Sequence, residues 1–142
     1  MAQITAELTK GTIVQMTNGR HTWTADEPFD KGGTDTGPTP YELLLGSLAA
    51  CTCATLALYA RYKGIALVAV RTSYTYERVH ADDCEQWADA KTGFIDHITT
   101  NVEIEGDFDE AQRKRLAQVA SRCPVHKTLA NGVVFSDNVS FA

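Results

Sequence analysis

The chain has 142 residues, a length that suits one domain with a single core. Charged residues make up 22% of it and apolar residues 44%, which is typical of a soluble globular protein. The formal net charge of -5, with no basic face to offset it, argues against a nucleic-acid partner. We therefore expect one domain over residues 1–142 that binds no nucleic acid.

The N-terminus gives no sign of export. Its first ten residues, MAQITAELTK, lack the basic start and apolar stretch of a secretory signal peptide. This predicts a cytoplasmic protein. In that compartment the four cysteines, at positions 51, 53, 84 and 123, are expected to be reduced, and catalytic or buried instead of joined in structural disulfides.

Residues 3–26 show the pattern of a β-meander. Apolar and polar residues alternate from Ile4 to Leu8, a second strand is predicted at 12–17, and a third at 21–24. Asn18-Gly19 between the last two is a strong hairpin signal, so Arg20 lies just beyond a tight turn. Residues 26–37 are polar and glycine-rich without a phosphate-loop pattern, and we expect an ordinary loop.

A long helix is predicted from Pro40 to Lys63. Thr39 is a suitable N-cap, Pro40 suits the first helical position, and Glu42 completes a capping box with Thr39. Gly64 is expected to close the helix. The 24 residues would span about 36 Å.

The middle of this helix, from Leu43 to Ala60, carries no charge. A membrane span is disfavoured, because the run is at the lower length limit and contains Gly, Ser and Thr. A helix that is apolar all round is normally buried on all sides. One chain of this length cannot cover it, so we predict an intertwined homodimer around a long central buried helix.

The second half of the chain is predicted to be a hairpin followed by helices. Residues 65–80 alternate cleanly between an apolar and a polar side, which favours an antiparallel sheet with one wet face. The remaining predictions are a polar hairpin tip at 81–93 that contains Cys84, a return strand at 94–105, a helix capped by Asp107 and ending near Cys123-Pro124, a short helix at 124–131 closed by Gly132, and a final strand at 133–141. The fold class is therefore α+β.

The thiols are the main candidates for chemistry. Cys51 lies in the middle of the long helix, where a buried cysteine often serves only to pack. Cys53 is about 200° further round the helix, so these two cannot bridge. Cys123 stands where a helix breaks at proline and a new one starts, and thiols near a helix N-terminus gain from its oriented N–H groups.

Two stretches resemble the OsmC/Ohr family, the osmotically induced and organic hydroperoxide resistance proteins. They are GPTPYELLLGSLAACT, which contains Cys51, and SRCPVHKTL, which contains Cys123. The amino-acid sequences of these two stretches are most similar to those of the broader OsmC-like branch of the family. The element order fits as well, so the resemblance covers most of the chain and implies an OsmC-like fold with two sites at a dimer interface.

The resemblance also implies a mechanism. Cys51 would be the peroxidatic thiol and Cys123 the resolving thiol of a metal-free peroxidase, whose disulfide is reduced by an external dithiol or a lipoyl-type reductant, with no cofactor. Family members place an arginine, held by a glutamate, beside the reactive thiol. Arg20 and Glu42 are the candidates, although the family glutamate aligns with Tyr41, one position earlier. Glu42 also has a sufficient structural role in the capping box.

Other chemistries have weaker support. The four histidines show no metal-ligand spacing, and no Gly-x-Ser-x-Gly hydrolase motif occurs. Two alternatives to a peroxidase stay open. One is a non-enzymatic OsmC-like dimer that binds a small apolar ligand at its interface, and the other is a thiol redox sensor.

Overall fold

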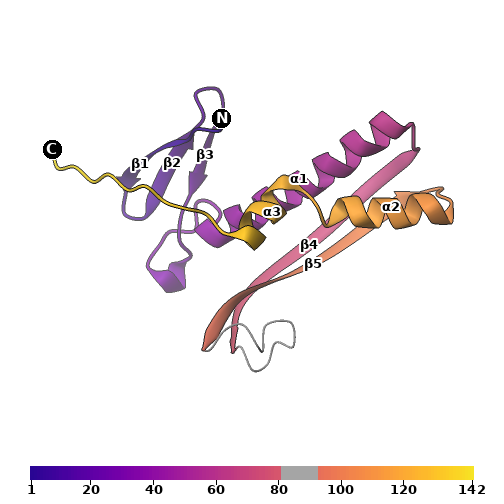
Figure 1. Ribbon diagram of the computed structural model, residues 1–142. Helices are drawn as coiled ribbons and strands as arrows, with labels where there is room; N and C mark the ends of the chain where they lie inside the picture. The colour runs from indigo at the N-terminus through magenta and orange to yellow at the C-terminus, as the bar shows by residue number, and fades with distance from the viewer. Residues whose placement is uncertain (81–92) are drawn as a thin grey trace. The chain divides into compact units, whose positions relative to one another are not determined.

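The computed structural model describes residues 1–80 and 93–142. The chain divides into two compact units, an N-terminal unit, Met1–Gly46, and a C-terminal unit, Ser47–Ala142. In chain order, three strands and a short 3-10 helix precede a long helix, a two-stranded hairpin and two further helices (Figure 1). The mixture of helices with two antiparallel sheets confirms the predicted α+β class.

The N-terminal unit contains the predicted meander. Strands β1 (Thr5–Lys10), β2 (Ile13–Thr17) and β3 (Thr22–Ala25) form one antiparallel sheet in that order. At the turn between β2 and β3, the Asn18 side-chain oxygen accepts hydrogen bonds from the N–H groups of Arg20 (3.0 Å) and His21 (2.8 Å). The pairing of β2 with β3 ends at Thr17 and Thr22, so the turn has four residues, 18–21, in place of the predicted two-residue Asn-Gly turn, and the Asn18 side chain satisfies its backbone.

The loop after β3 is organised by one buried carboxylate, Asp26, which is 2% exposed. Its Oδ2 atom accepts hydrogen bonds from the backbone N–H and the hydroxyl of both Thr34 and Thr36. Its Oδ1 atom accepts from the hydroxyl of Thr12 (2.5 Å) and the N–H of Glu27 (2.7 Å). These hydrogen bonds, led by that of Thr12, hold the pKa of Asp26 far below its ordinary value.

The loop therefore has a fixed path. It contains one 3-10 turn, η1 (Phe29–Lys31), and passes so close to the backbone of Glu27 that a Cβ atom at Gly33 would collide with it. Sequence reasoning treated this stretch as an ordinary loop and missed the role of Asp26.

Helix α1 (Pro40–Lys63) has the predicted bounds and caps. The N–H of Thr39 donates to Glu42 Oε2 (2.9 Å), and the N–H of Glu42 donates to Thr39 Oγ1 (3.2 Å), so the capping box is present. At the other end Gly64 has a φ of 66°, and the N–H of Ile65 donates to the carbonyl of Ala60 (2.9 Å). This is a Schellman C-cap, which requires a left-handed residue at the glycine position.

Only one line of α1 is fully buried within the single chain. Its residues recur every fourth position, which places them on one face of the helix: Leu48, Thr52, Leu56 and Ala60. Ala50, Ala54 and Leu58, on another side, are exposed. Among the described helices α1 is the one long and apolar enough to cross a bilayer, but the core helix of a soluble protein meets the same criteria.

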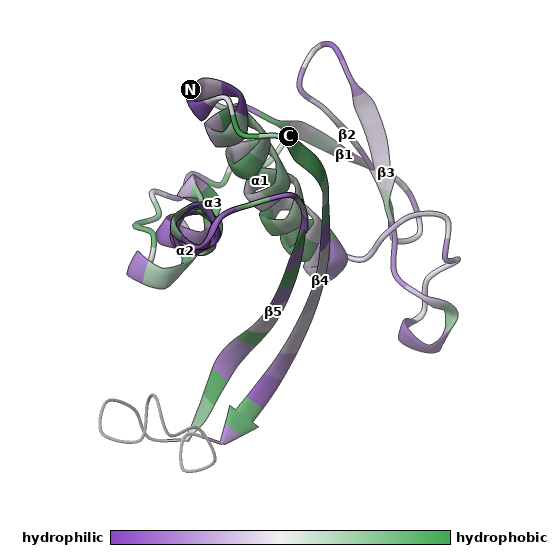
Figure 2. Cartoon of the chain, turned by 90° about the vertical axis from the view of Figure 1, so that its right-hand side faces the viewer, coloured by the Kyte–Doolittle hydropathy of each residue, from purple (hydrophilic) through white to green (hydrophobic). Residues whose placement is uncertain are grey.

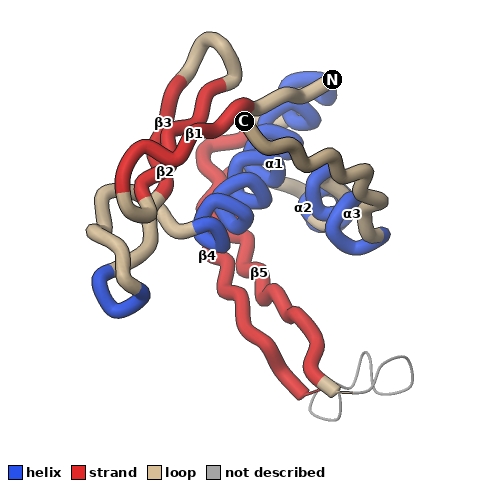
Figure 3. The backbone as a smooth tube through the Cα atoms, turned by 90° about the vertical axis from the view of Figure 1, so that its left-hand side faces the viewer, coloured by secondary structure: helices blue, strands red, loops and turns tan. Residues whose placement is uncertain are grey.

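Strands β4 (Leu67–His80) and β5 (Phe94–Gly106) form a long antiparallel hairpin. Figure 3 shows the two strands running side by side over their length. The predicted alternation is confirmed from Val70 to Tyr76, because Val70, Thr72, Tyr74 and Tyr76 are partly buried while the residues between them are exposed. Val68, which the pattern also placed on the apolar side, is 68% exposed, because the pairing register shifts between Leu67 and Ala69. Figure 2 shows the same alternation as hydrophobic and hydrophilic bands along both strands. The predicted hairpin tip and Cys84 lie in residues 81–92, outside the described part.

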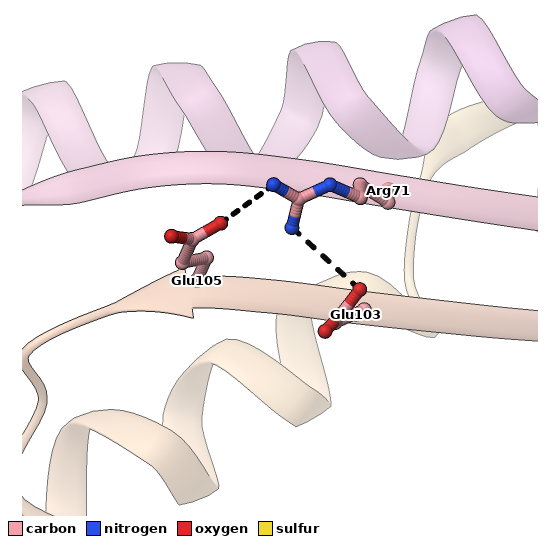
Figure 4. A network of polar contacts seen from close by, with 3 residues as sticks. All are labelled: Arg71, Glu103 and Glu105. Atoms are coloured by element: carbon pink, nitrogen blue, oxygen red, sulfur yellow. Dashed lines mark ion pairs between the residues drawn. The ribbon is translucent and has the colours of Figure 1, made fainter.

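The exposed face of the hairpin carries charge pairs. Arg71 on β4 contacts Glu105 (Nη2 to Oε2, 2.7 Å) and Glu103 (Nη1 to Oε2, 3.6 Å) on β5 (Figure 4). The hydrogen bond and charge of Glu105, together with Glu103, raise the pKa of Arg71. All three side chains are about half exposed or more, so these ion pairs contribute little to stability. They lie on the solvent-exposed face of the sheet.

The apolar face of the hairpin packs against α1 and α2 (Glu110–Ala120). Leu56 of α1, Phe108, and Leu116 and Val119 of α2 form the buried cluster, against which Val70, Val102 and Ile104 of the sheet pack. Burial of these apolar side chains is what holds α1 and α2 on this face.

Helix α2 begins later than predicted. Its N-cap is Asp109, which forms a capping box with Gln112, and the predicted cap Asp107 lies before the helix. The chain first turns Phe108 into the core, where it is 9% exposed, and only then starts the helix. The following helix, α3 (Pro124–Asn131), has the predicted bounds, and Gly132 is its C-cap.

The predicted final strand at 133–141 is wrong for this single chain. Residues 133–142 have no regular structure, and their apolar side chains are exposed; Val134 is 95% and Phe141 95% exposed. A strand needs a neighbour for its N–H and C=O groups, and no described strand pairs with this segment.

Candidate functional site

The C-terminal unit contains one buried thiol in a polar setting. Cys123 is 0% exposed and is the N-cap residue of α3. Its Sγ atom accepts a hydrogen bond from the N–H of His126 (3.3 Å). The sulfur therefore takes the place that a serine or aspartate oxygen has at other helix starts, where the first N–H groups of the helix need an acceptor.

Two hydroxyl groups connect this sulfur to the sheet. The Thr52 hydroxyl on α1 donates to Cys123 Sγ (3.6 Å), and the Tyr74 hydroxyl on β4 donates to Thr52 Oγ1 (2.9 Å). Thr52 is 3% exposed and belongs to the buried line of α1. The result is a continuous chain of polar atoms, from Tyr74 through Thr52 to Cys123, across an otherwise apolar interior.

The hydroxyl end of this chain opens into a cavity of about 280 Å³. Its lining comes from α1, both strands of the hairpin, α2, the turn after α2, and α3: Thr52, Tyr74, Thr100, Val102, Ile104, Ala117, Ala120, Ser121 and His126. Cys123 does not line it. Two of the lining residues contact the buried sulfur, Thr52 through its hydroxyl and His126 through its backbone N–H.

Cys51 precedes Thr52 in α1 and is partly exposed. Its Sγ atom has a long contact with Thr55 Oγ1 (4.0 Å). Neighbouring residues of a helix point about 100° apart, so Cys51 and Thr52 face different surroundings. Cys51, Cys53 and Cys123 are all free thiols, and the Cys123 sulfur is directed at Thr52.

The other two predicted site residues belong to the N-terminal unit. Glu42 is engaged in the capping box of α1, as its position after Thr39 suggested. Arg20 is exposed at the turn between β2 and β3, where its backbone N–H is held by Asn18. The roles of Arg20 and Glu42 beside Cys51 stay predictions.

Sequence reasoning missed Thr52 and Tyr74. Thr52 looked like one of several small residues diluting an apolar run, and Tyr74 like one of two tyrosines on the inner side of a strand. A usable signal did exist, since a hydroxyl on the buried face of a helix or strand must find a partner. Which partner it finds depends on packing between residues 22 and 71 positions apart.

Comparison with known proteins assigns the family. The family model described as OsmC-like protein matches residues 33–136, which include both Cys51 and Cys123. The chain belongs to the OsmC-like protein family. No curated protein matches this OsmC-like chain in sequence.

Solved structures share the fold of this OsmC-like chain. The OsmC-like protein of Mycoplasma pneumoniae has a TM-score of 0.70 and 28% identity, covering 92% of this chain and 87% of that one. The organic hydroperoxide resistance protein OhrB of Bacillus subtilis has a TM-score of 0.57 and 22% identity, covering 89% and 88%. An organic hydroperoxide resistance protein OsmC of Legionella pneumophila has a TM-score of 0.61 and 20% identity, covering 89% and 87%.

Family membership bears on the apolar helix. The family model spans the whole of α1, so this apolar run is part of the OsmC-like domain. The exposed apolar side of α1 is then expected to be shielded from solvent by another protein surface.

Proposed function

We propose that this OsmC-like chain is a cytoplasmic, thiol-dependent peroxidase that reduces organic hydroperoxides and also hydrogen peroxide. Family membership and the shared fold with organic hydroperoxide resistance proteins support a role in peroxide resistance. Free thiols in two different settings, one partly exposed and one buried, supply what a two-cysteine cycle needs.

The chemistry runs in three steps. The Cys51 thiolate attacks the terminal peroxide oxygen, so that a sulfur–oxygen bond forms and the O–O bond breaks. Cys51 becomes a sulfenic acid, and the departing alkoxide takes a proton from solvent and leaves as the alcohol. The Cys123 sulfur then attacks the Cys51 sulfur, a disulfide forms, and water leaves. An external dithiol or a lipoyl-type reductant reduces the disulfide, and neither a metal nor a bound cofactor takes part.

One observation carries the proposal more than any other. The buried Cys123 sulfur contacts the residue that directly follows Cys51, so the two thiols belong to adjacent parts of one packed unit. Cys51, partly exposed, suits the group that meets a peroxide, and Cys123, shielded from solvent, suits the group that acts second. A thiol that only fills space would not need two hydrogen-bond donors.

The proposal includes a homodimer. The exposed side of α1 carries small and apolar residues, Ala50, Ala54 and Leu58, and the apolar C-terminal segment 133–141 has no partner strand within the described chain. A second copy would cover both. In this dimer Arg20, oriented by Glu42, would supply the positive charge that keeps Cys51 ionised, drawing on both subunits.

The decisive experiment follows peroxide consumption with cumene hydroperoxide and a dithiol. Cys51→Ser should abolish turnover, since no other residue is assigned to attack the peroxide. Cys123→Ser should stop turnover after one round and leave a sulfenic acid on Cys51 that dimedone traps. If both variants consume peroxide as fast as the parent chain, the proposed mechanism is wrong.

Thiol titration separates this function from its two alternatives. One equivalent of cumene hydroperoxide should remove two free thiols per chain, and a dithiol should restore them. Thiols that do not react at all would favour a dimer that binds a small apolar ligand. A disulfide that forms and that no dithiol recycles would favour a redox sensor.

A further inference from the structure

We propose that Thr52 and Tyr74 form a proton path that connects the buried Cys123 thiol to water in the adjacent cavity. The inference rests on the proposed peroxidase function and concerns its second step, the attack of Cys123 on oxidised Cys51. Thr52 would be the catalytic residue, since it contacts the reacting sulfur, and Tyr74 a positioning residue that acts through Thr52.

The need for such a path comes from burial. The thiolate, and not the thiol, is the nucleophile in disulfide formation. Cys123 is 0% exposed and does not line the cavity, so bulk water cannot take its proton directly. A group in contact with the sulfur has to accept that proton and pass it on.

Thr52 is suited to this task and His126 is not. The backbone N–H of His126 can only donate, so it stabilises negative charge on the sulfur but cannot accept a proton. The Thr52 hydroxyl both donates and accepts. Among the described residues, it is the one hydrogen-bond partner of Cys123 Sγ with a lone pair to offer.

The path continues without a gap to the cavity. The Tyr74 hydroxyl donates a hydrogen bond to Thr52 Oγ1 (2.9 Å). Both residues line the cavity of about 280 Å³, which is large enough for several water molecules. Hydroxyl hydrogens rotate freely, so the hydrogen bonds that link Tyr74, Thr52 and Cys123 can point in either direction. In the structure Tyr74 donates to Thr52 and Thr52 donates to Cys123 Sγ. For the step to begin, both hydroxyls rotate, so that Cys123 donates to Thr52 and Thr52 donates to Tyr74. After it, both hydroxyls point back toward the charged sulfur.

The step balances in atoms and electrons. The Cys123 proton passes to Thr52 while the Thr52 proton passes to Tyr74, and Tyr74 releases its own proton to cavity water. The electron pair left on Cys123 forms the bond to the Cys51 sulfur, and the sulfur–oxygen bond of the sulfenic acid breaks. The departing hydroxide takes one proton from solvent and becomes water.

The test uses three variants of the full chain, in a background with Cys53 and Cys84 changed to serine. Thr52→Val keeps the shape and removes the hydroxyl, Thr52→Ser keeps the hydroxyl, and Tyr74→Phe removes the second link. Tyr76→Phe is the matched control, because Tyr76 lies on the same side of β4 and its hydroxyl instead donates to Asp96. Thermal unfolding confirms that each variant is folded.

Two rates are measured by rapid quenching and mass spectrometry, sulfenic acid formation on Cys51 and disulfide formation with Cys123. We expect Thr52→Val to slow disulfide formation about tenfold, the effect of losing one hydrogen bond to a charged group. Tyr74→Phe should slow it less, and sulfenic acid formation should be unchanged in both. Thr52→Ser and Tyr76→Phe should behave like the parent chain.

Three results would overturn the proton path: disulfide formation at the parent rate in Thr52→Val, equal slowing of both steps, or failure of Thr52→Ser to restore the rate. A second measurement tests the proton path even if the chain proves not to be a peroxidase. In a Cys51→Ser chain, Thr52→Val should slow alkylation of Cys123 by iodoacetamide and Thr52→Ser should not. An unchanged alkylation rate in Thr52→Val overturns the path even if no peroxide is ever reduced.

Discussion

Asp26 shows how much one side chain can determine. It is the acceptor for six hydrogen-bond donors, which come from Thr12 just before β2, from the adjacent Glu27, and from Thr34 and Thr36 near the far end of the loop. Every neighbour presents a donor, so the site matches a carboxylate and no neutral isostere. A buried charge is tolerated here because each of its lone pairs is satisfied.

We predict that Asp26→Asn lowers the midpoint of thermal unfolding by several degrees, because the new amide N–H₂ would face donors. Asp30→Asn, an exposed aspartate in the same loop, should leave the midpoint unchanged. Differential scanning calorimetry of the two variants checks this. Equal midpoints for the two variants would contradict the role assigned to Asp26.

The same carboxylate predicts a dependence on pH. The pKa of Asp26 is depressed in the folded chain, so its contribution to stability is complete above the unfolded value of about 3.9 and is lost as the pH falls below it. The stability difference between the parent chain and Asp26→Asn should therefore be constant from pH 7 to 5 and shrink toward pH 3. Urea unfolding at each pH measures it, and a constant difference down to pH 3 would be the contrary result.

At the scale of elements, α1 is defined by its ends. The capping box at Thr39 and the Schellman motif at Gly64 satisfy backbone groups within a few residues of each terminus. That is why both bounds could be predicted. The predicted N-cap of α2, Asp107, lies two residues before the observed one, Asp109. The burial of Phe108 between them accounts for the later start.

The N-terminus of α1 offers a way to separate the two roles of Glu42. Glu42→Gln keeps a capping-box acceptor but removes the charge, so stability should change little. Thr39→Ala removes the cap and should cost about 1 kcal/mol of stability. If Glu42 orients Arg20, Glu42→Gln should slow the first step with peroxide about tenfold or more, while Thr39→Ala should not. Chemical unfolding and single-turnover peroxide assays measure the two effects, and a parent-like rate in Glu42→Gln would confine Glu42 to capping.

At the scale of the whole molecule, the apolar surface is unevenly covered. Leu48 and Leu56 of α1 are buried, whereas Leu58 is 58% exposed on the same helix, and Phe135 in the C-terminal segment is 76% exposed. Exposed apolar surface of this extent indicates an interface. The strand predicted at 133–141 would then form only when another chain provides an edge.

We therefore predict a dimer in solution that Ala54→Arg weakens, since a long charged side chain would meet the partner on the exposed side of α1. Ala111→Arg, on the exposed side of α2, is the matched control and should stay dimeric. Sedimentation velocity from 1 to 100 µM distinguishes the two species. A parent chain that is monomeric throughout, or Ala54→Arg that is as dimeric as the control, would remove the homodimer from the proposal.

The sequence by itself determined the features whose causes are local. The bounds of α1 and α3, the Asn18 turn and the two faces of β4 follow from caps, turn residues and alternation, each encoded within a few neighbouring positions. The motifs around Cys51 and Cys123 were also enough to suggest the family that the comparisons then established.

Only the tertiary structure decided which polar groups meet. The Thr52 hydroxyl binds a sulfur 71 positions away, and Asp26 collects donors up to 14 positions away. A buried hydroxyl or carboxylate requires a partner, but the pattern of residues does not say which one, since the choice depends on how helices and strands pack. For the same reason the sequence could not assign an edge to the strand predicted at 133–141, and the structure leaves that segment without regular structure.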